Sequence, residues 1–226
     1  MREAMTLTID ARNLRLRDVQ RLLKFSEQLN EPITSLLSLE SLTEFEQREL
    51  QIISNIFNEY YASGKISEGQ IKFLFLAPLM KLAGFYQPSI KITLEENIAD
   101  IYIEDEDTNI KGRIDILAVK KTQKQTISTP FWIVVIESKN SGINATEGLP
   151  QLLTYAYQSL EYQTSTWGVT TNGMDYQFVY LQSGSSPTYQ VFPKLDITRA
   201  ESAIELLQIL KAICNINSLN LSVPLN

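Results

Sequence analysis

The fold is decided by the stretch FWIVVIESK, residues 131–139. Its first six residues are apolar, which is typical of a β-strand that is buried on both faces of a sheet. Side chains alternate between the two faces of a strand, so Glu137 and Lys139 point to one side and Ser138 points to the other. This strand therefore ends with a carboxylate and an ammonium group side by side.

A second apolar stretch, GRIDILAVK at residues 112–120, also contains a carboxylate, Asp115. Burying a charge is costly unless the charge is paired or binds a metal ion. If the two strands are neighbours in the sheet, Asp115, Glu137 and Lys139 converge on one small site. Carboxylate oxygens are the ligands that a hard divalent cation prefers, so this set is suited to such a cation.

The composition predicts an ordinary globular protein of one sizeable domain, with or without a helical appendage. The chain has 226 residues, of which 44% are hydrophobic and 20% are charged. No apolar run approaches the roughly 18 residues that a membrane span needs, and the N-terminus lacks the apolar region of a secretory signal. The single cysteine, Cys214, excludes an internal disulfide framework. We therefore expect a cytoplasmic protein with no membrane association.

The absence of histidine narrows the possible chemistry. It excludes histidine-based catalytic triads, most zinc sites and a histidine general base. Chemistry would have to come from carboxylates, lysine and an oxygen-ligated metal such as Mg²⁺. The net charge of −6 argues against a strongly basic, non-specific nucleic-acid binder, but it leaves room for a local positive cleft.

The rest of the chain alternates between helical and extended patterns. A capping-box sequence, SEGQ at residues 67–70, opens an apolar helix that runs to Gly84, and Pro78 predicts an irregularity within it. Asn172 and Gly173 predict a tight turn. The other predicted helices lie within residues 14–62, 149–162 and 197–214, and the other predicted strands are residues 90–94, 98–103, 166–171, 176–181 and 189–192.

This order of elements predicts an α/β fold with a central mixed β-sheet flanked by helices. We expect two parts. Residues 1–64 would form an N-terminal helical extension, and residues 65–226 would form the core domain on which it packs.

The predicted order, with an aspartate on one strand and E-x-K on the next, resembles the PD-(D/E)XK nuclease core, which is also called the restriction-endonuclease-like fold. The resemblance covers roughly residues 65–182 and is greatest to the nuclease module at the N-terminus of type I restriction-enzyme R subunits. Residues 112–116 match the aspartate-bearing strand of that family, and residues 137–139 match its E-x-K strand. Ile114, rather than the family's proline, precedes Asp115.

Three flanking matches extend the resemblance. Glu68 matches an acidic residue that the family carries on a helix ahead of the strands. Gln151, Leu152 and Tyr155 match its Q-L-x-x-Y helix, and the segment GVTTNG at residues 168–173 matches its T-N-G strand and turn.

The resemblance implies a Mg²⁺- or Mn²⁺-dependent endonuclease that hydrolyses phosphodiester bonds in DNA, of a restriction, defence or repair type. Asp115 and Glu137 would hold the metal together with the backbone carbonyl of Ser138. Glu68 would anchor a second metal or a water. Lys139 would orient the attacking water or stabilise charge in the transition state, and Gln151 would hydrogen-bond the nucleophile or the substrate.

Other interpretations of the same residues remain open. Glu137 and Lys139 could form a simple ion pair, Glu68 could only complement the dipole of its helix, and Tyr155 is expected to pack with its hydroxyl at the surface. The acidic run at residues 104–107 is interpreted as a solvated turn.

The fold could also serve a different function. A catalytically idle copy could bind DNA or another protein, and an active site of this type could equally cut RNA or branched DNA. Pairing of two copies, or recruitment by partner subunits, is compatible with the sequence, although no residue pattern specifies either.

Overall fold

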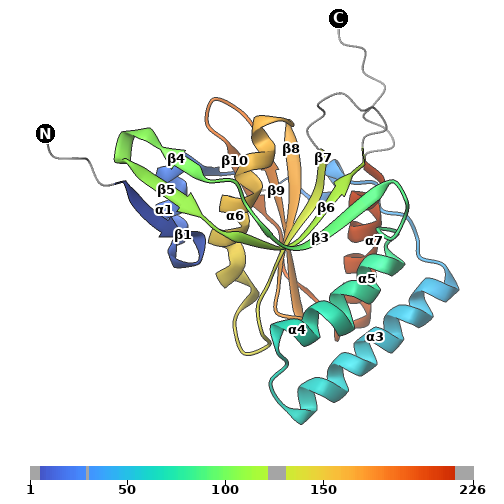
Figure 1. Ribbon diagram of the computed structural model, residues 1–226. Coiled ribbons are helices and arrows are strands. Elements are labelled where there is room, and N and C mark those ends of the chain that lie inside the picture. The colour runs from blue at the N-terminus through green and yellow to red at the C-terminus, as the bar shows by residue number, and fades with distance from the viewer. Residues whose placement is uncertain (1–5, 29–30, 122–130, 217–226) are drawn as a thin grey trace, which may run out of the picture.

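A mixed β-sheet lies between two layers of helices in the computed structural model, which describes residues 6–28, 31–121 and 131–216. Helices α3, α4, α5 and α7 cover one face of the sheet, and α6 and α1 cover the other (Figure 1). The predicted α/β architecture with a mixed sheet and flanking helices is therefore confirmed. Its finer assignment to the restriction-endonuclease-like core stays a prediction.

The larger sheet has the strand order β2–β10–β9–β8–β7–β6–β3, and β11 pairs with β9. Strands β3, β6 and β7 form an antiparallel meander, and β8 lies parallel to β7. The Asp115 strand and the E-x-K strand are therefore neighbours, which is the condition for a shared site. The strand bounds are β2 (Ser26–Glu27), β3 (Ile90–Asn97), β6 (Arg113–Lys120), β7 (Phe131–Ser138), β8 (Ser165–Thr171), β9 (Asp175–Gln182), β10 (Thr188–Val191) and β11 (Leu195–Asp196).

The helices agree closely with the apolar patterns that predicted them. None of those in the described residues is both long enough and apolar enough to cross a membrane. Their bounds are α1 (Leu16–Leu22), α2 (Ile33–Leu36), α3 (Glu44–Ser63), α4 (Glu68–Gln70), α5 (Ala77–Leu82), α6 (Leu149–Tyr157) and α7 (Ala200–Asn215), with short 3₁₀ turns η1 (Ala11–Asn13), η3 (Glu104–Glu106), η4 (Ala145–Gly148) and η5 (Gln158–Glu161).

The N-terminal segment is not purely helical, which corrects the prediction of a helical extension over residues 1–64. Strand β1 (Leu7–Asp10) pairs with β5 (Thr108–Lys111) in a small second sheet that also contains β4 (Ile101–Ile103). Strand β2 joins the edge of the larger sheet through β10. Both strands are short and are defined by main-chain pairing with distant partners, so their own residues carry little signal. The division into two domains stays a prediction.

The core consists of two apolar clusters, one on each side of the larger sheet. Val134 and Ile136 of β7 belong to the cluster beneath α3, α5 and α7, whereas Val135 belongs to the cluster beneath α6. The alternation along β7 therefore fills both clusters, as expected for a strand covered on both faces. The acidic run after β4 forms the exposed turn η3, which agrees with its interpretation as a solvated turn.

One continuous helical segment carries α4, a π-helical turn η2 (Ile71–Leu76) and α5. The predicted capping box is confirmed, because the Gln70 N–H donates to Ser67 Oγ at 3.3 Å and the Ser67 N–H donates to Gln70 Oε1 at 3.0 Å. Pro78 does not break the helix. The irregularity lies just before it, where the Ala77 N–H donates to the carbonyl of Lys72, five residues back. Such π-helical turns occur frequently at functional sites.

The predicted turn between β8 and β9 ties this helical segment to the sheet. Asn172 Oδ1 accepts hydrogen bonds from the N–H groups of Met174 and Asp175, at 3.1 and 2.8 Å. Gly173 has φ +88°, and a Cβ there would come within 2.9 Å of Ile71 in the π-helical turn. Glycine is therefore required both for the conformation and for the close approach.

Candidate active site

Strands β6 and β7 bring the two predicted acids together at one end of the sheet. The last paired residues are Ile116 and Ile136, and the next residue outward on each strand is Asp115 or Glu137. Asp115 is 9% exposed and Glu137 is 2% exposed. Both carboxylates are therefore buried at neighbouring positions of adjacent strands, as the sequence predicts. Their convergence on one shared metal site stays a prediction.

Asp115 accepts hydrogen bonds from the adjacent strand β7 and from the helical segment that covers the sheet. Its Oδ2 accepts from the amide N–H of Ser138 at 2.8 Å and from the Ser138 hydroxyl at 2.9 Å. Its Oδ1 accepts from the ammonium group of Lys72, on the π-helical turn, at 2.8 Å. Ser138 thus contacts Asp115 through its amide and hydroxyl, and the role of its carbonyl as a metal ligand stays a prediction.

Glu137 has one paired oxygen and one unpaired oxygen. Its Oε1 accepts from Lys139 Nζ at 2.8 Å, as the alternation of the strand predicts. Its Oε2 is buried and has no hydrogen-bond partner among the described residues. Burial, together with the negative charge of Asp115, raises the pKa of Glu137 to about 8, although Lys139 acts in the opposite direction. Burying a charged oxygen without a partner is costly, so Oε2 is the atom of Glu137 at which a bound cation would be most favourable.

Lys139 connects Glu137 to helix α6. Its ammonium group also donates to Gln151 Oε1, and Gln151 Nε2 donates to the Tyr155 hydroxyl at 3.2 Å. Gln151 is buried beside the site, where it orients Lys139. Its predicted contact with a nucleophile or substrate stays a prediction.

Tyr155 differs from its prediction, because it is fully buried and its hydroxyl lies in the network rather than at the surface. The spacing of Gln151 and Tyr155 by four residues, which puts them on one face of a helix, could have signalled this contact. Burial raises the pKa of Tyr155 to about 12, so the hydroxyl stays protonated at neutral pH. The packing is close: a Cβ at Gly112 would lie 2.5 Å from the Tyr155 ring.

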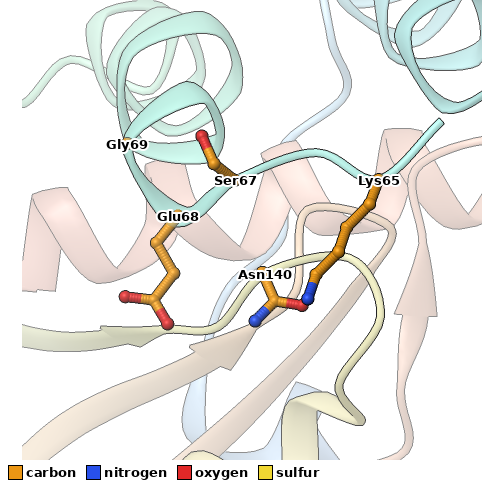
Figure 2. Close-up of a pocket in the computed structure, with 5 residues that line it drawn as sticks. All are labelled: Lys65, Ser67, Glu68, Gly69 and Asn140. Atoms are coloured by element: carbon orange, nitrogen blue, oxygen red, sulfur yellow. The ribbon is translucent and has the colours of Figure 1, made fainter. Parts of the chain in front are cut away.

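Glu68 lies at the start of α4, beside the end of the E-x-K strand. Figure 2 shows its side chain in a pocket that it lines together with Lys65, Ser67, Gly69 and Asn140, the residue after Lys139. Burial is the main cause of the raised pKa of Glu137, and the charge of Glu68 adds to it, so the two carboxylates are close enough to interact. Glu68 is half-buried, and among the described residues it does not gather with Asp115 and Glu137 into a group that could hold a metal ion by itself. It stands at the rim of the site.

Two further charged residues belong to the site and were not predicted from the sequence. Lys72 bonds Glu95 as well as Asp115, and Glu95 also pairs with Arg113 at 2.8 Å. Burial lowers the pKa of Lys72, but its hydrogen bonds to Asp115 and Glu95 outweigh this and raise the pKa above its ordinary value. The spacing of Glu68 and Lys72 by four residues is the one signal that placed Lys72 on the same helical face as a predicted site residue.

The donors fit a divalent cation only in part. Among the described residues, no three His, Cys, Asp or Glu side chains gather closely enough to hold a metal ion by themselves. Asp115 and Glu137 nevertheless supply buried carboxylate oxygens, and Glu137 Oε2 is a buried acceptor without a partner. Mg²⁺ is commonly bound through one or two carboxylates, with waters and substrate phosphate completing the shell. The residues present are compatible with that mode of binding.

The raised pKa of Glu137 predicts how the stability of the metal-free protein depends on pH. The unfolded state loses this proton near pH 4.5 and the folded state near pH 8, so the folded state is stabilised below pH 4.5 and loses that stabilisation as the pH rises to 8. We expect the Tm in EDTA to fall by roughly 5–10 °C more in the wild type than in Glu137→Gln between pH 5 and pH 8. Differential scanning fluorimetry of both proteins measures this. Parallel pH profiles would contradict it.

Comparison with protein-family models found no match to this chain, and comparison with curated proteins found no relative of significant similarity. The function of the site is therefore inferred from its residues and their geometry.

Proposed function

We propose that this chain is a metal-dependent nuclease of the restriction-endonuclease-like class that hydrolyses phosphodiester bonds in DNA. The observation that carries the proposal is the arrangement of Asp115, Glu137 and Lys139. Two carboxylates are buried at neighbouring positions of adjacent strands at one end of the sheet. Ser138 holds Asp115, and the ammonium group of Lys139 pairs with Glu137. Burying ionisable groups costs desolvation energy, and groups whose pKa is perturbed by burial cluster at functional sites.

Each residue has a role in that reaction. Asp115 and Glu137 would hold Mg²⁺ or Mn²⁺, and the Ser138 amide and hydroxyl keep Asp115 in place. A cation at this position would polarise the phosphodiester and make hydroxide available near neutral pH. Lys139, positioned by Glu137 and Gln151, would stabilise negative charge that develops on the phosphoryl oxygens.

Cationic side chains around the site support a nucleic-acid substrate despite the net charge of −6. Arg12 is exposed on η1, and its pKa is raised mainly by its hydrogen bond to Asp10, with smaller contributions from Tyr155 and Glu137 of the site. Arg113, two residues before Asp115 on β6, is exposed and pairs with Glu95. Lys65 lines the pocket beside Glu68 (Figure 2). Such groups are suited to the phosphates that flank a cleavage point.

The test is the conversion of supercoiled plasmid to nicked and linear forms by wild-type protein over a titration of MgCl₂ or MnCl₂. We expect cleavage that appears with metal and stops with EDTA. A parallel titration with a single-stranded RNA distinguishes DNA from RNA as the substrate. Binding of either nucleic acid without any metal-dependent cleavage would favour the idle module over the nuclease.

A further inference from the structure

Lys72 occupies the position from which a cation would approach Asp115. Its side chain is 17% exposed and its ammonium group lies 2.8 Å from Asp115 Oδ1, while the other oxygen, Oδ2, already accepts two hydrogen bonds from Ser138. The part of Asp115 that is free of Ser138 is therefore covered by a positive charge that belongs to the protein itself.

Lys72 and a divalent cation cannot both bind closely to the same oxygen of Asp115. Two positive groups only a few ångströms apart in a partly buried site repel each other strongly, because the surroundings screen them poorly. A metal that binds Asp115 must therefore move the ammonium group of Lys72 away from Oδ1.

Glu95 provides a second place for that ammonium group. Lys72 already donates to Glu95, so the side chain needs only to give up one of its two acceptors. Glu95 lies in β3 between Leu94, which pairs with Ile116, and Glu96, which pairs with Ile114, so it stands opposite Asp115. Its φ of +55° interrupts the regular pairing, and a local irregularity of this kind re-aims a side chain.

We propose that Lys72 is a built-in competitor for the metal site, which neutralises Asp115 in the metal-free protein and shifts to Glu95 when a divalent cation binds. Lys72 is thus a positioning residue that sets the metal affinity of the site. This inference rests on the proposed metal-dependent function, but metal binding tests it separately from cleavage.

The experiment measures Mn²⁺ binding by calorimetry for wild type, Lys72→Met and Lys72→Gln, with the fold checked by circular dichroism and thermal unfolding. We expect both variants to bind Mn²⁺ at least about tenfold more tightly, which is the effect that one nearby charge has on the proton affinity of a carboxylate. Both should also be less stable than wild type in EDTA and gain more stability from Mn²⁺. Lys72→Arg keeps the charge and should bind Mn²⁺ no more tightly than wild type.

Lys211→Met is the matched control. The side chains of Lys211 and Glu46 form a pair that is 18% and 14% exposed, close to the 17% and 13% of Lys72 and Asp115, but it joins α7 to the start of α3, far from α4 (Figure 1). This variant should lose stability without any change in Mn²⁺ affinity.

Two outcomes would overturn the inference, and they differ in what else they affect. If wild type binds Mn²⁺ and the Lys72→Met and Lys72→Gln variants bind it equally or more weakly, Lys72 is only a structural ion-pair partner, while the proposed function stands. If neither wild type nor the variants bind Mn²⁺, both the inference and the metal-dependent function are wrong.

Discussion

Asp115→Asn is expected to reduce metal-dependent cleavage of supercoiled plasmid by at least about 10³-fold, which corresponds to roughly 4 kcal/mol of transition-state stabilisation. The substitution removes one of two carboxylates available to the metal. The amide keeps the shape of the side chain, and its oxygen can still accept from Ser138. Its NH₂ group then faces Lys72, which retains Glu95 as an acceptor. The fold should therefore persist while the metal site is lost.

The measurement is the initial rate of nicking in saturating MgCl₂, together with binding of a short fluorescent duplex in EDTA, which should change little. Asp100→Asn is the matched control, because Asp100 is an exposed acid paired with Lys111 outside the site. It should cut at the wild-type rate. Cleavage by Asp115→Asn above about a tenth of the wild-type rate, at any metal concentration, would contradict the proposed function.

Lys139→Met is expected to lower the rate of cleavage at saturating metal by about 10²–10³-fold, the usual cost of removing one group that stabilises charge in a transition state. Lys139 is 15% exposed and its ammonium group is held by Glu137 and Gln151, so its position is defined before any substrate binds. Methionine has a similar length and no charge. It leaves both carboxylates in place, so the loss should fall on the rate rather than on metal binding.

Single-turnover cleavage and Mn²⁺ calorimetry separate these two effects. The Lys211→Met variant again serves as the control, since it removes a lysine of similar exposure that pairs with Glu46 on α3 instead of with a residue of the site. If Lys139→Met cuts within about threefold of wild type, the lysine only neutralises Glu137. If metal affinity and rate fall together by the same factor, Lys139 acts through the carboxylates and does not contact the phosphate.

Much of the fold could be predicted from local patterns. The six apolar residues before Glu137 predict a strand buried on both faces, and the structure places Val134 and Val135 in opposite clusters. The Ser67 capping box and the Asn172-Gly173 turn depend on hydrogen bonds between residues no more than three positions apart. Both could therefore be predicted without knowledge of the tertiary structure. Strands β1 and β2 could not be predicted, because they form only by pairing with β5 and β10.

The candidate site divides in the same way. The charges of Asp115, Glu137 and Lys139 are conspicuous in the sequence because they interrupt apolar strands. In the sequence, Lys72 and Glu95 resemble ordinary surface residues. The contacts of Lys72 with Glu95, 23 residues further along the chain, and with Asp115, 43 residues further along, assign them to the site. Tyr155 was misplaced for the same reason, since a tyrosine on an apolar helix can bury its hydroxyl only where a partner such as Gln151 meets it.

The sequence by itself determined that two acids and a lysine are buried at the ends of apolar strands, and the absence of histidine confined their chemistry to oxygen ligands and ammonium groups. Only the tertiary structure decided the strand order, in which β6 and β7 are neighbours. It also decided that the π-helical turn lies close enough to the sheet for Lys72 to contact Asp115. The physical reason is that the local pattern of apolar residues predicts which segments are buried. The partner of a buried charge, in contrast, depends on packing between elements that are distant in the chain.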